Sequence, residues 1–248
     1  MTAVKCNPDP YVLRLLAALG AGFDCASNGE IATVLGLGGV DPSRVVFANP
    51  CKATSFIRSA AKAGVDKMTF DNEDELYKIA RVHPRAKLIV RILADDSKSI
   101  CRFGTKFGAS LEVVPRLLTK ARELHLDVIG VSFHVGSGCY DPTIYEDAVR
   151  RARDAFDIGS QVGYRFSLLD VGGGFEDGRL ETAASVLTRA VQHYFPDRTG
   201  IKVIAEPGRY YVSRAFSLAT NIIARRAPMN EGTCDSESKT AEPSVMCG

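Results

Sequence analysis

Lys5 stands in a short apolar run near the start of the chain, Ala3-Val4-Lys5-Cys6-Asn7. A lysine between small and apolar strand-forming residues is expected to point into the protein rather than into solvent. Burial lowers the pKa of an ammonium group, and the neutral amine can form a Schiff base with an aldehyde. The run therefore predicts a nucleophilic lysine. The simpler alternative is a lysine that happens to precede a helix.

Glycines and an arginine form a second candidate group in the last third of the chain. Gly172, Gly173 and Gly174 follow one apolar run, and Gly208 with Arg209 follows the next. Bare backbone N–H groups beside a positive charge suit a phosphate group. A flexible turn would use the same glycines, but the neighbouring arginine favours an anion site.

Five more polar residues extend this arrangement. Ser137, which follows Gly136 in the run HVGSG, offers a hydroxyl donor to the same phosphate. A phosphorylated aldehyde beside a lysine points to pyridoxal phosphate. Glu206 could pair with its pyridine nitrogen, and His134 could stack on its ring unless it is a satisfied core histidine. Asp24 and Arg91 could orient the lysine and the substrate, or each could be half of a structural ion pair.

These residues come at the ends of apolar runs, so the arrangement of the runs decides whether they can meet. We expect strands at residues 2–7, 22–25, 45–48, 67–70, 87–93, 128–134, 166–171 and 202–206. Helices are expected between them at residues 10–19, 27–37, 53–63, 71–82, 111–124, 142–162 and 182–194. Ser27, with Glu30 three residues later, predicts one capped helix start, and Asp71 predicts another.

Eight strand–helix units with strands apolar on both faces predict an α/β fold, a parallel sheet closed into a (β/α)8 TIM barrel. In such a barrel the residues that follow the strands gather at one end, where the phosphate site and the active site of this architecture lie. An open doubly wound sheet is the alternative. It is disfavoured because no G-x-G-x-x-G follows the first apolar run.

The composition narrows the functional classes. With 248 residues, 46% of them hydrophobic, the chain can bury a full-sized core. Its 31 basic and 29 acidic residues give a net charge of +2, which favours neither a nucleic-acid nor a membrane partner. No run is apolar enough to span a membrane and no leader is recognisable, so we expect a cytoplasmic protein. Seven scattered cysteines without a C-x-x-C pair argue against a metal site and a disulfide framework.

Six motifs closely resemble the barrel domain of eukaryotic ornithine decarboxylases, which belong to the alanine-racemase-like pyridoxal-phosphate enzymes. They are AVKCN at 3–7, FDCAS at 23–27, ANPCK at 48–52, SFHVGSG at 132–138, DVGGGF at 170–175 and AEPGRYY at 205–211. The resemblance covers nearly all of the chain from residue 2 to about residue 226. HVGSGC combined with FDCAS is more similar to the ornithine branch than to the diaminopimelate and arginine decarboxylase relatives.

The resemblance implies that pyridoxal 5'-phosphate serves the decarboxylation of L-ornithine to putrescine, with a homodimer in the full-length form. Lysine, arginine and diaminopimelate decarboxylases remain alternatives. It implies Lys5 as the Schiff-base lysine, Glu206 as the partner of the pyridine nitrogen and His134 as the residue stacked on the ring. The remaining cofactor-binding residues that it implies are Asp24, Arg91, Ser137, Gly172, Gly173, Gly174, Gly208 and Arg209.

The domain organisation is expected to be a cofactor-binding barrel at residues 1–226, followed by a polar linker and the start of a β domain at residues 227–248. The family continues into a β-rich domain that provides a phosphate-binding tyrosine, the carboxylates that recognise the distal substrate amine, and a catalytic cysteine acting across a dimer interface. We therefore expect the chain as given to be truncated and inactive, or nearly so, by itself. Substrate choice would then depend on residues beyond Gly248.

A binding protein without decarboxylase activity is the alternative from another functional class, because antizyme inhibitors resemble the same family. The presence of all the implied site residues favours descent from an active enzyme. Residues 51–84 resemble the antizyme-binding region of the family, so antizyme is an expected partner, although an ordinary solvent-facing helix pair would look the same. A barrel without a second domain, like the small pyridoxal-phosphate homeostasis proteins, is disfavoured by the polar tail.

Overall fold

The computed structural model describes residues 1–224. Eight parallel strands form one sheet, in which the spatial order of the strands follows the chain. The strands are β1 (Thr2–Ala3), β2 (Phe23–Cys25), β3 (Val45–Phe47), β4 (Lys67–Phe70), β5 (Lys87–Arg91), β7 (Asp127–Ser132), β9 (Leu168–Asp170) and β10 (Lys202–Ile204). The eight predicted strands are therefore all present, most of them shorter than the apolar runs.

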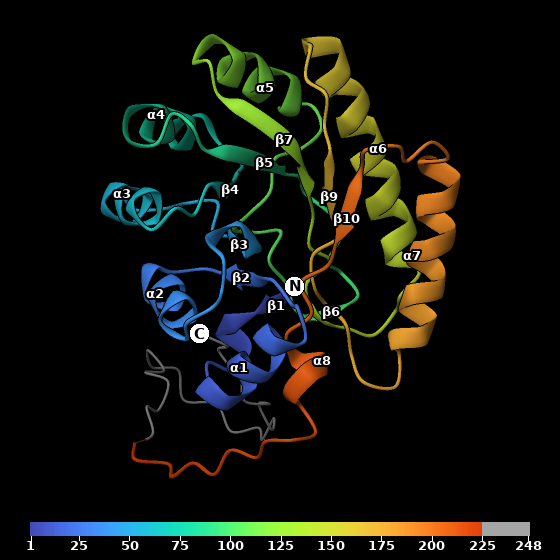
Figure 1. Ribbon diagram of the computed structural model, residues 1–248. Coiled ribbons are helices and arrows are strands. Elements are labelled where there is room, and N and C mark those ends of the chain that lie inside the picture. Colours follow the sequence, from blue (N-terminus) through green and yellow to red (C-terminus); the bar gives the residue numbers. More distant parts are fainter. Residues whose placement is uncertain (225–248) are drawn as a thin grey trace, which may run out of the picture.

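A helix follows each of these strands and lies outside the curled sheet (Figure 1). The helices are α1 (Pro10–Ala18), α2 (Asn28–Gly36), α3 (Thr54–Lys62), α4 (Glu73–Val82), α5 (Val114–Glu123), α6 (Ile144–Val162), α7 (Leu180–Tyr194) and α8 (Arg209–Val212). Two short 3-10 turns, η1 (Val4–Cys6) and η2 (Pro42–Arg44), lie between these elements. The alternation of strand and helix brings the end of every strand to the same rim of the sheet.

The two edge strands of the sheet, β1 and β10, meet through the residues beside them. The Met1 amine donates a hydrogen bond to the Ala205 carbonyl at 2.8 Å, and the Ala3 amide donates to the Pro207 carbonyl at 3.2 Å. These two contacts bring the first segment of the chain against the segment after β10. The sheet is thus curled into the predicted barrel.

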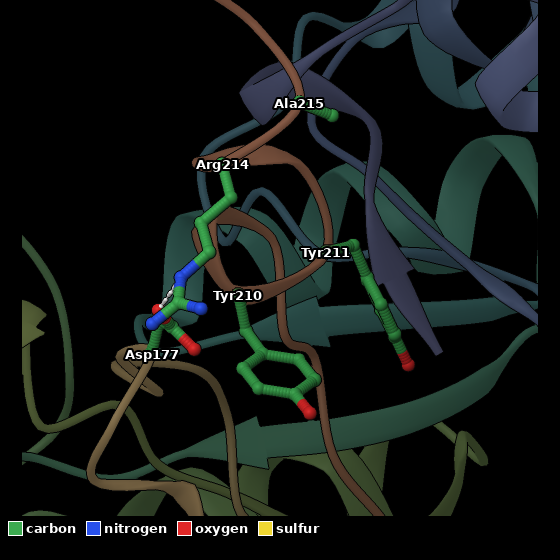
Figure 2. A pocket seen from close by; sticks show the side chains of 5 residues that line it. All are labelled: Asp177, Tyr210, Tyr211, Arg214 and Ala215. Atoms are coloured by element: carbon green, nitrogen blue, oxygen red, sulfur yellow. Dashed lines mark ion pairs between the residues drawn. The ribbon is translucent and has the colours of Figure 1, made fainter.

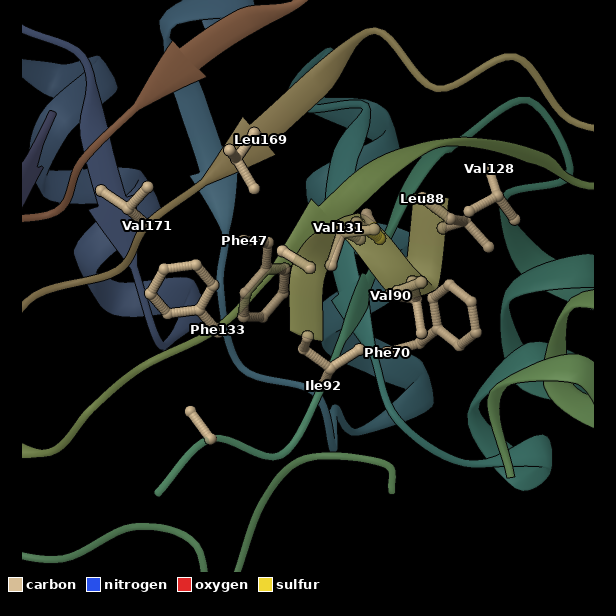
Figure 3. Packing of buried hydrophobic residues seen from close by; sticks show 14 of the residues in the cluster. Phe47, Phe70, Leu88, Val90, Ile92, Val128, Val131, Phe133, Leu169 and Val171 are labelled. Atoms are coloured by element: carbon tan, nitrogen blue, oxygen red, sulfur yellow. The ribbon is translucent and has the colours of Figure 1, made fainter. Parts of the chain in front are cut away.

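The main core fills the layer between the sheet and the helices. Phe47, Phe70, Val90 and Leu169 are each fully buried there and project from four different strands (Figure 3). Burial of each such side chain stabilises the fold by about 1.5–3 kcal/mol. A smaller cluster around Val46 fills the inside of the sheet, so the strands are apolar on both faces, as a covered parallel sheet requires.

The first predicted strand, at residues 2–7, ends earlier than expected. Residues Val4–Cys6 turn into η1 instead of continuing β1, so Lys5 lies on a tight turn just after the strand. This turn places the lysine at the rim of the barrel, next to Asp24 of β2, because Ala3 and Asp24 are paired in register.

The predicted helix caps were half right. Ser27 Oγ accepts a hydrogen bond from the Glu30 amide at 3.2 Å, which confirms the first cap. At the start of α4 the cap is Asn72 rather than Asp71, because the Asp71 carboxylate instead accepts a hydrogen bond from the Gly108 amide at 2.9 Å. The sequence offers two capping residues in succession, and the distant contact decides between them.

A small antiparallel ribbon was not predicted. Strand β6 (Ser99–Cys101), in the loop after β5, pairs with β8 (Ser137–Cys139), in the loop after β7. The ribbon ties these two loops together over the rim of the barrel. It therefore fixes the backbone of Ser137, one of the predicted phosphate ligands.

Within residues 1–224, no helix is long and apolar enough to cross a membrane. The predicted linker at residues 227–248 lies outside the described residues. The proposed domain boundary near residue 226 therefore stays a prediction.

Candidate active site

The structure gathers the predicted site residues at the rim formed by the carboxyl ends of the strands. Asp24 lies within β2 and Arg91 is the last residue of β5, whereas Lys5 follows β1. The others lie in the segments that follow β7, β9 and β10, where Ser137 begins β8 and Arg209 begins α8. They are His134, Ser137, Gly172, Gly173, Gly174, Glu206, Gly208 and Arg209. Residues from distant parts of the chain therefore share one end of the barrel.

Lys5 forms an ion pair with Asp24, with 2.7 Å between Nζ and Oδ2. The lysine side chain is 47% exposed, while the Asp24 carboxylate that holds its ammonium group is 1% exposed. Burial of the ammonium lowers the Lys5 pKa, but the charges of Asp24 and Glu206 outweigh burial, so the pKa is raised above its ordinary value. The expectation of a buried lysine with a lowered pKa is therefore wrong.

Two buried carboxyl groups, Asp170 and Glu206, face each other at the closure of the barrel. Burial raises the pKa of Glu206 well above its ordinary value, and repulsion from Asp170 adds to this effect. Burial also raises the pKa of Asp170 to about 6. Among the described residues, Asp170 Oδ2 and Glu206 Oε1 have no hydrogen-bond partner, although both are buried. The pair therefore holds a proton near neutral pH and can accept a donor from a ligand.

The His134 ring is held as the neutral form. Its Nδ1 atom accepts a hydrogen bond from the Gly136 amide at 3.0 Å, which leaves the ring proton on Nε2. Burial lowers the His134 pKa well below its ordinary value, and the positive charges of Arg91 and Lys5 lower it further. A neutral imidazole with a fixed tautomer is a suitable flat surface for an aromatic ligand.

The glycine triplet follows β9 where the chain has no room for side chains. Gly172 has φ +64°, and a Cβ atom there would lie 2.1 Å from the Phe133 carbonyl oxygen. A Cβ atom on Gly173 would lie 2.9 Å from His134 Nε2. Gly174 has φ +98°, and its carbonyl accepts a hydrogen bond from the Cys139 amide at 3.2 Å. The bare backbone of the triplet thus lies against the loop that carries His134 and Ser137.

Arg209 links the loops after β7, β9 and β10. Its Nη2 atom donates to Ser137 Oγ at 3.2 Å, and its Nε atom lies 3.2 Å from Glu176 Oε1. Gly208 lies against η1, because a Cβ atom there would be 2.9 Å from Cys6 Cβ. The positive charge, the hydroxyl and the lysine turn are thus brought together as the sequence predicted.

Arg91 is placed differently from the other predicted residues. Its guanidinium lies 5.1 Å from the centre of the Phe107 ring. Burial lowers the Arg91 pKa, whereas Glu206 and Asp71 act against this change. In the described part of the chain, no ion pair joins Arg91 to Asp24, the carboxylate that holds Lys5. No direct contact among the described residues therefore supports the predicted role of Arg91 in orienting Lys5.

Two acidic residues at the site received no role from the sequence: Asp170 was noted only as a polar residue at a strand end, and Glu176 was not singled out. Asp170 pairs with Glu206, and Glu176 pairs with Arg209. Their positions just before and just after the glycine triplet were the available signal. Acidic residues are common at such positions, and a partner from another loop is invisible in the chain order.

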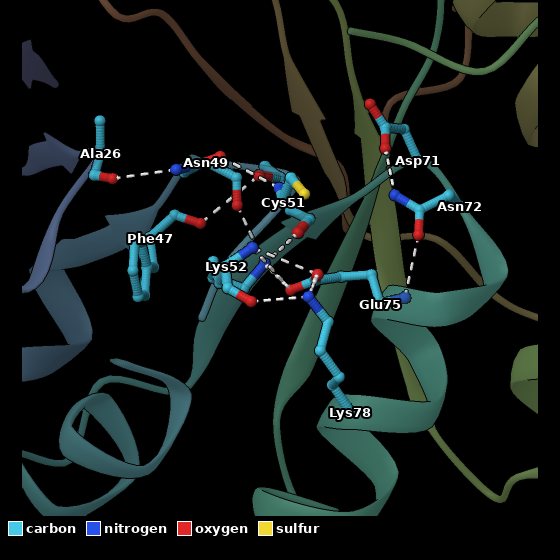
Figure 4. Close-up of polar contacts among 10 residues, drawn as sticks. Ala26, Phe47, Asn49, Cys51, Lys52, Asp71, Asn72, Glu75 and Lys78 are labelled. Carbon is cyan, nitrogen blue, oxygen red and sulfur yellow. Dashed lines mark hydrogen bonds and ion pairs between the residues drawn. The ribbon is translucent and has the colours of Figure 1, made fainter. Parts of the chain in front are cut away.

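A buried polar network occupies the part of the rim near β3 and β4 (Figure 4). Lys52 Nζ lies 2.8 Å from Glu75 Oε1 and donates to the carbonyls of Thr69 and Asn49 at 2.7 and 3.0 Å. Lys78 pairs with the other oxygen of Glu75. Burial lowers the pKa of Lys52, although Glu75 opposes this effect. This network joins the loop after β3 to helix α4.

An open cavity of about 390 Å³ lies beside the Arg209 loop (Figure 2). It is lined by Asp177, Tyr210, Tyr211, Arg214 and Ala215, and Arg214 forms an ion pair with Asp177. None of the predicted site residues lines this cavity. It is therefore a neighbour of the candidate site and not the site itself.

The candidate site fits pyridoxal phosphate on three structural grounds. The unpartnered Glu206 oxygen can receive the pyridine N–H, the bare glycine backbone with Arg209 and Ser137 can receive the phosphate, and Lys5 offers an amine. These groups come from four separate loops. A single small molecule with a ring, an aldehyde and a phosphate would satisfy all of them.

Comparison with known proteins identifies the family. Residues 1–213 match the family described as pyridoxal-dependent decarboxylase, pyridoxal binding domain. The chain is 53% identical to ornithine decarboxylase of Rattus norvegicus over 98% of this chain and 54% of the relative. It is 51% identical to antizyme inhibitor 2 of Xenopus laevis over 98% of this chain and 54% of that protein.

Solved structures agree with this result. The arginine decarboxylase of Paramecium bursaria Chlorella virus, bound to agmatine, superimposes with a TM-score of 0.82 at 40% identity, over 85% of this chain and 57% of that chain. The TIM-barrel prediction and the sequence resemblance are thereby confirmed. The chain spans about half the length of the curated relatives that it matches. It belongs to the pyridoxal-dependent decarboxylases, and the part that the family match covers is their pyridoxal binding domain.

Proposed function

We propose that this chain forms the pyridoxal-phosphate-binding part of an L-ornithine decarboxylase. The observation that carries the proposal is the meeting of Lys5, the Asp170–Glu206 carboxyl pair and the Arg209–Ser137 contact at one rim of the barrel. The 53% identity to an ornithine decarboxylase supports ornithine as the substrate. When bound, pyridoxal phosphate supplies an aldehyde for amines and a ring that accepts the electron pair released by a departing carboxylate.

The loops after β7, β9 and β10 would hold the phosphate. Arg209 supplies the positive charge, Ser137 a hydroxyl, and Gly172, Gly173 and Gly174 supply backbone that a side chain would otherwise cover. Charge-assisted hydrogen bonds of this kind are among the stronger ones in proteins. Their origin in three loops makes the site depend on closure of the barrel.

Glu206 would hold the proton at the pyridine nitrogen. Its raised pKa results first from burial and then from the charges of Asp170 and Asp24. A cation placed beside it would favour the ionised carboxylate and relieve its unpaired oxygen. His134, neutral and fixed by Gly136, would lie against the ring.

Lys5 would supply the reacting amine, with Asp24 as the group that controls its proton. The ammonium must lose a proton before the amine can attack a carbonyl carbon. Asp24 Oδ2 is hydrogen-bonded to Lys5 Nζ, while Asp24 Oδ1 is buried and unpartnered among the described residues. Asp24 therefore both orients the lysine and holds its proton until a ligand changes the local charge.

A binding protein of the antizyme-inhibitor type is the second candidate function, favoured by the 51% identity to antizyme inhibitor 2. Decarboxylation of lysine, arginine or diaminopimelate is the alternative within the enzyme class, and the likeness to an arginine decarboxylase keeps it open. We also propose a homodimer for the full-length form, antizyme binding through residues 51–84, and a cytoplasmic location.

Titration with pyridoxal phosphate tests the proposed site. The purified chain should acquire the visible absorbance of a cofactor whose aldehyde is bound by a lysine, and Lys5→Ala should abolish it. Lys62→Ala is the matched control, because Lys62 is exposed on α3 and away from the rim. Retention of the absorbance in Lys5→Ala would show that another residue provides the amine.

A decarboxylation assay tests the proposed reaction. We expect a form of the protein that also carries the family's second domain to release putrescine from ornithine faster than it decarboxylates lysine or arginine. The 248-residue chain alone should release little or none. Efficient putrescine release by the chain alone would contradict the expectation that the second domain is needed.

A further inference from the structure

Two phenylalanines in the loop between β5 and α5 cover two residues of the candidate site. The Phe103 and His134 rings meet edge to face, with 5.0 Å between their centres and 72° between their planes. The Phe107 ring lies 5.1 Å from the Arg91 guanidinium. We call residues 95–107, which lead from β5 across the rim, the β5–α5 strap. The strap thus places aromatic surface on His134 and on Arg91.

Two sets of hydrogen bonds anchor the strap near Phe103. The Asp96 carboxylate accepts hydrogen bonds from the backbone amides of Phe103 and Gly104, which fixes the turn that carries the ring. Ser99 Oγ donates to the buried Val135 carbonyl at 2.6 Å, next to His134 in the chain. The position of Phe103 is therefore set by the same loop that it contacts.

The His134 ring is held at three places. Its Nδ1 atom is bonded to the Gly136 amide, its Nε2 edge faces Gly173, and Phe103 contacts the ring itself. The hydrogen bond to Nδ1 fixes the tautomer and restrains rotation about the Cβ–Cγ bond on one edge of the ring. The contact with the Phe103 ring adds a restraint on the plane of the imidazole, because edge-to-face geometry has a preferred orientation.

We propose that Phe103 is a positioning residue, which fixes the plane of the His134 ring and so prepares the surface that receives the pyridine ring of the cofactor. The contact between Phe103 and His134 does not depend on the proposed function, whereas its expected effect on cofactor binding does. Among the aromatic contacts of the described residues, Phe103 meets His134. We therefore expect its effect on cofactor binding to pass through the histidine.

The test compares Phe103→Leu with wild type by two measurements on the 248-residue chain. The first is the NMR signals of the His134 ring without cofactor, identified among the four histidines by their loss in His134→Asn. These signals should move in Phe103→Leu because the neighbouring ring is gone. The second is the dissociation constant of pyridoxal phosphate, which should rise about 2- to 10-fold, as expected for loss of one aromatic pair.

Phe166→Leu is the matched control. Phe166 is also partly buried and also meets another ring edge to face, Phe156, at 5.3 Å and 87°. It precedes β9 and so lies at the opposite end of the barrel from the site. This variant should lose a comparable amount of packing, yet leave the His134 signals and the dissociation constant at wild-type values.

Phe103→Tyr keeps the ring and should restore both measurements to near wild type. The proposal is overturned if Phe103→Leu leaves the His134 signals where Phe166→Leu leaves them, or if the tyrosine variant behaves like the leucine variant. If wild type fails to bind pyridoxal phosphate, the proposed function fails, while the His134 signals still decide whether Phe103 holds the ring.

Discussion

Two lysines lie at the rim of the barrel, and their surroundings differ in almost every respect. Lys52 is fully buried, and burial lowers its pKa. Its three N–H donors meet three acceptors, on Asn49, Thr69 and Glu75. Lys5 is about half exposed, and its pKa is raised. Among residues 1–224 its ammonium group has a single partner, Asp24.

The comparison shows that burial and a lowered pKa do not by themselves mark a reactive lysine. By those two criteria Lys52 would be chosen, yet all of its hydrogen-bonding capacity is used within the protein. Within the part of the chain that the structure describes, Lys5 keeps donors free, and buried carboxyl oxygens of Asp24 and Glu206 have no hydrogen-bond partner. Polar groups left unsatisfied in a buried place mark where a ligand can bind.

The same contrast divides the rim into two regions. We call the network of Lys52, Glu75 and Lys78 the closed region, and the group of Lys5, Asp24, Asp170 and Glu206 the open region. In the closed region charges stabilise the fold by being paired. In the open region carboxyl groups repel one another, which costs stability and favours ligand binding.

Breaking the closed region should have the largest effect. Glu75→Leu leaves the buried Lys52 ammonium without its counter-charge, and loss of one partner of a buried pair costs about 3–5 kcal/mol. Urea unfolding should report this loss of unfolding free energy. The double variant Lys52→Met with Glu75→Leu should recover much of the lost unfolding free energy. If Glu75→Leu alone were as stable as wild type, the distinction between the two regions would be wrong.

In the open region, removal of a charged group is expected to raise the unfolding free energy rather than lower it. Asp170→Asn should raise the unfolding free energy by about 2–3 kcal/mol at neutral pH, because the Asp170 pKa rises from 3.8 to about 6 on folding. The asparagine oxygen can still accept from the Gly172 amide.

The pH dependence checks the sign of this effect. A carboxyl group with a raised pKa contributes stability that is complete below its unfolded pKa of 3.8 and is lost as pH rises through about 6. The advantage of Asp170→Asn should therefore vanish near pH 4 and grow up to about pH 7. An advantage that is equal at all pH values would exclude the raised pKa of Asp170 as its source.

Adding a side chain to the glycine triplet should lower both the stability of the fold and the affinity for the cofactor. A methyl group at Gly173 would lie 2.9 Å from the Glu206 carbonyl oxygen and from His134 Nε2, so Gly173→Ala should cost about 1–3 kcal/mol and weaken cofactor binding. Gly36→Ala is the control, because a Cβ atom in that helical position meets nothing within 4 Å. The control should be neutral or slightly stabilising.

The smallest effect is expected at Ser137. Ser137→Ala removes a hydroxyl that accepts from Arg209, so cofactor affinity should fall about 2- to 10-fold, the value of one hydrogen bond. Stability in urea should stay close to that of wild type, because both residues are partly exposed. A loss of stability without a change in affinity would assign Ser137 to the scaffold instead.

The fold was predictable because its signals are local and repeated. Eight apolar runs that alternate with segments of helical periodicity predict a parallel sheet covered by helices. The residues at the strand ends followed from that topology, which is why the lysine turn, Ser137 and Arg209 were expected at one rim. The start of α2 was equally local, since Ser27 and Glu30 cap it from within one turn.

What could not be predicted depends on contacts between distant segments. The raised pKa of Lys5 comes from Asp24, whereas the immediate neighbours of the lysine in the chain are apolar or uncharged. The carboxyl pair of Asp170 and Glu206 forms only when the last strands meet the first. Strand β6 is only three residues long, Ser99–Cys101, so neither its existence nor its pairing with β8 had a sequence signal.

Chemical trapping of the cofactor tests the central claim most directly. The chain is incubated with pyridoxal phosphate and reduced with borohydride, and the labelled peptide is identified by mass spectrometry. We predict the label on Lys5, in the open region, and none on Lys52, in the closed region. A label on Lys52, or equal labelling of exposed lysines with none on Lys5, would contradict the assignment of the open region as the cofactor site.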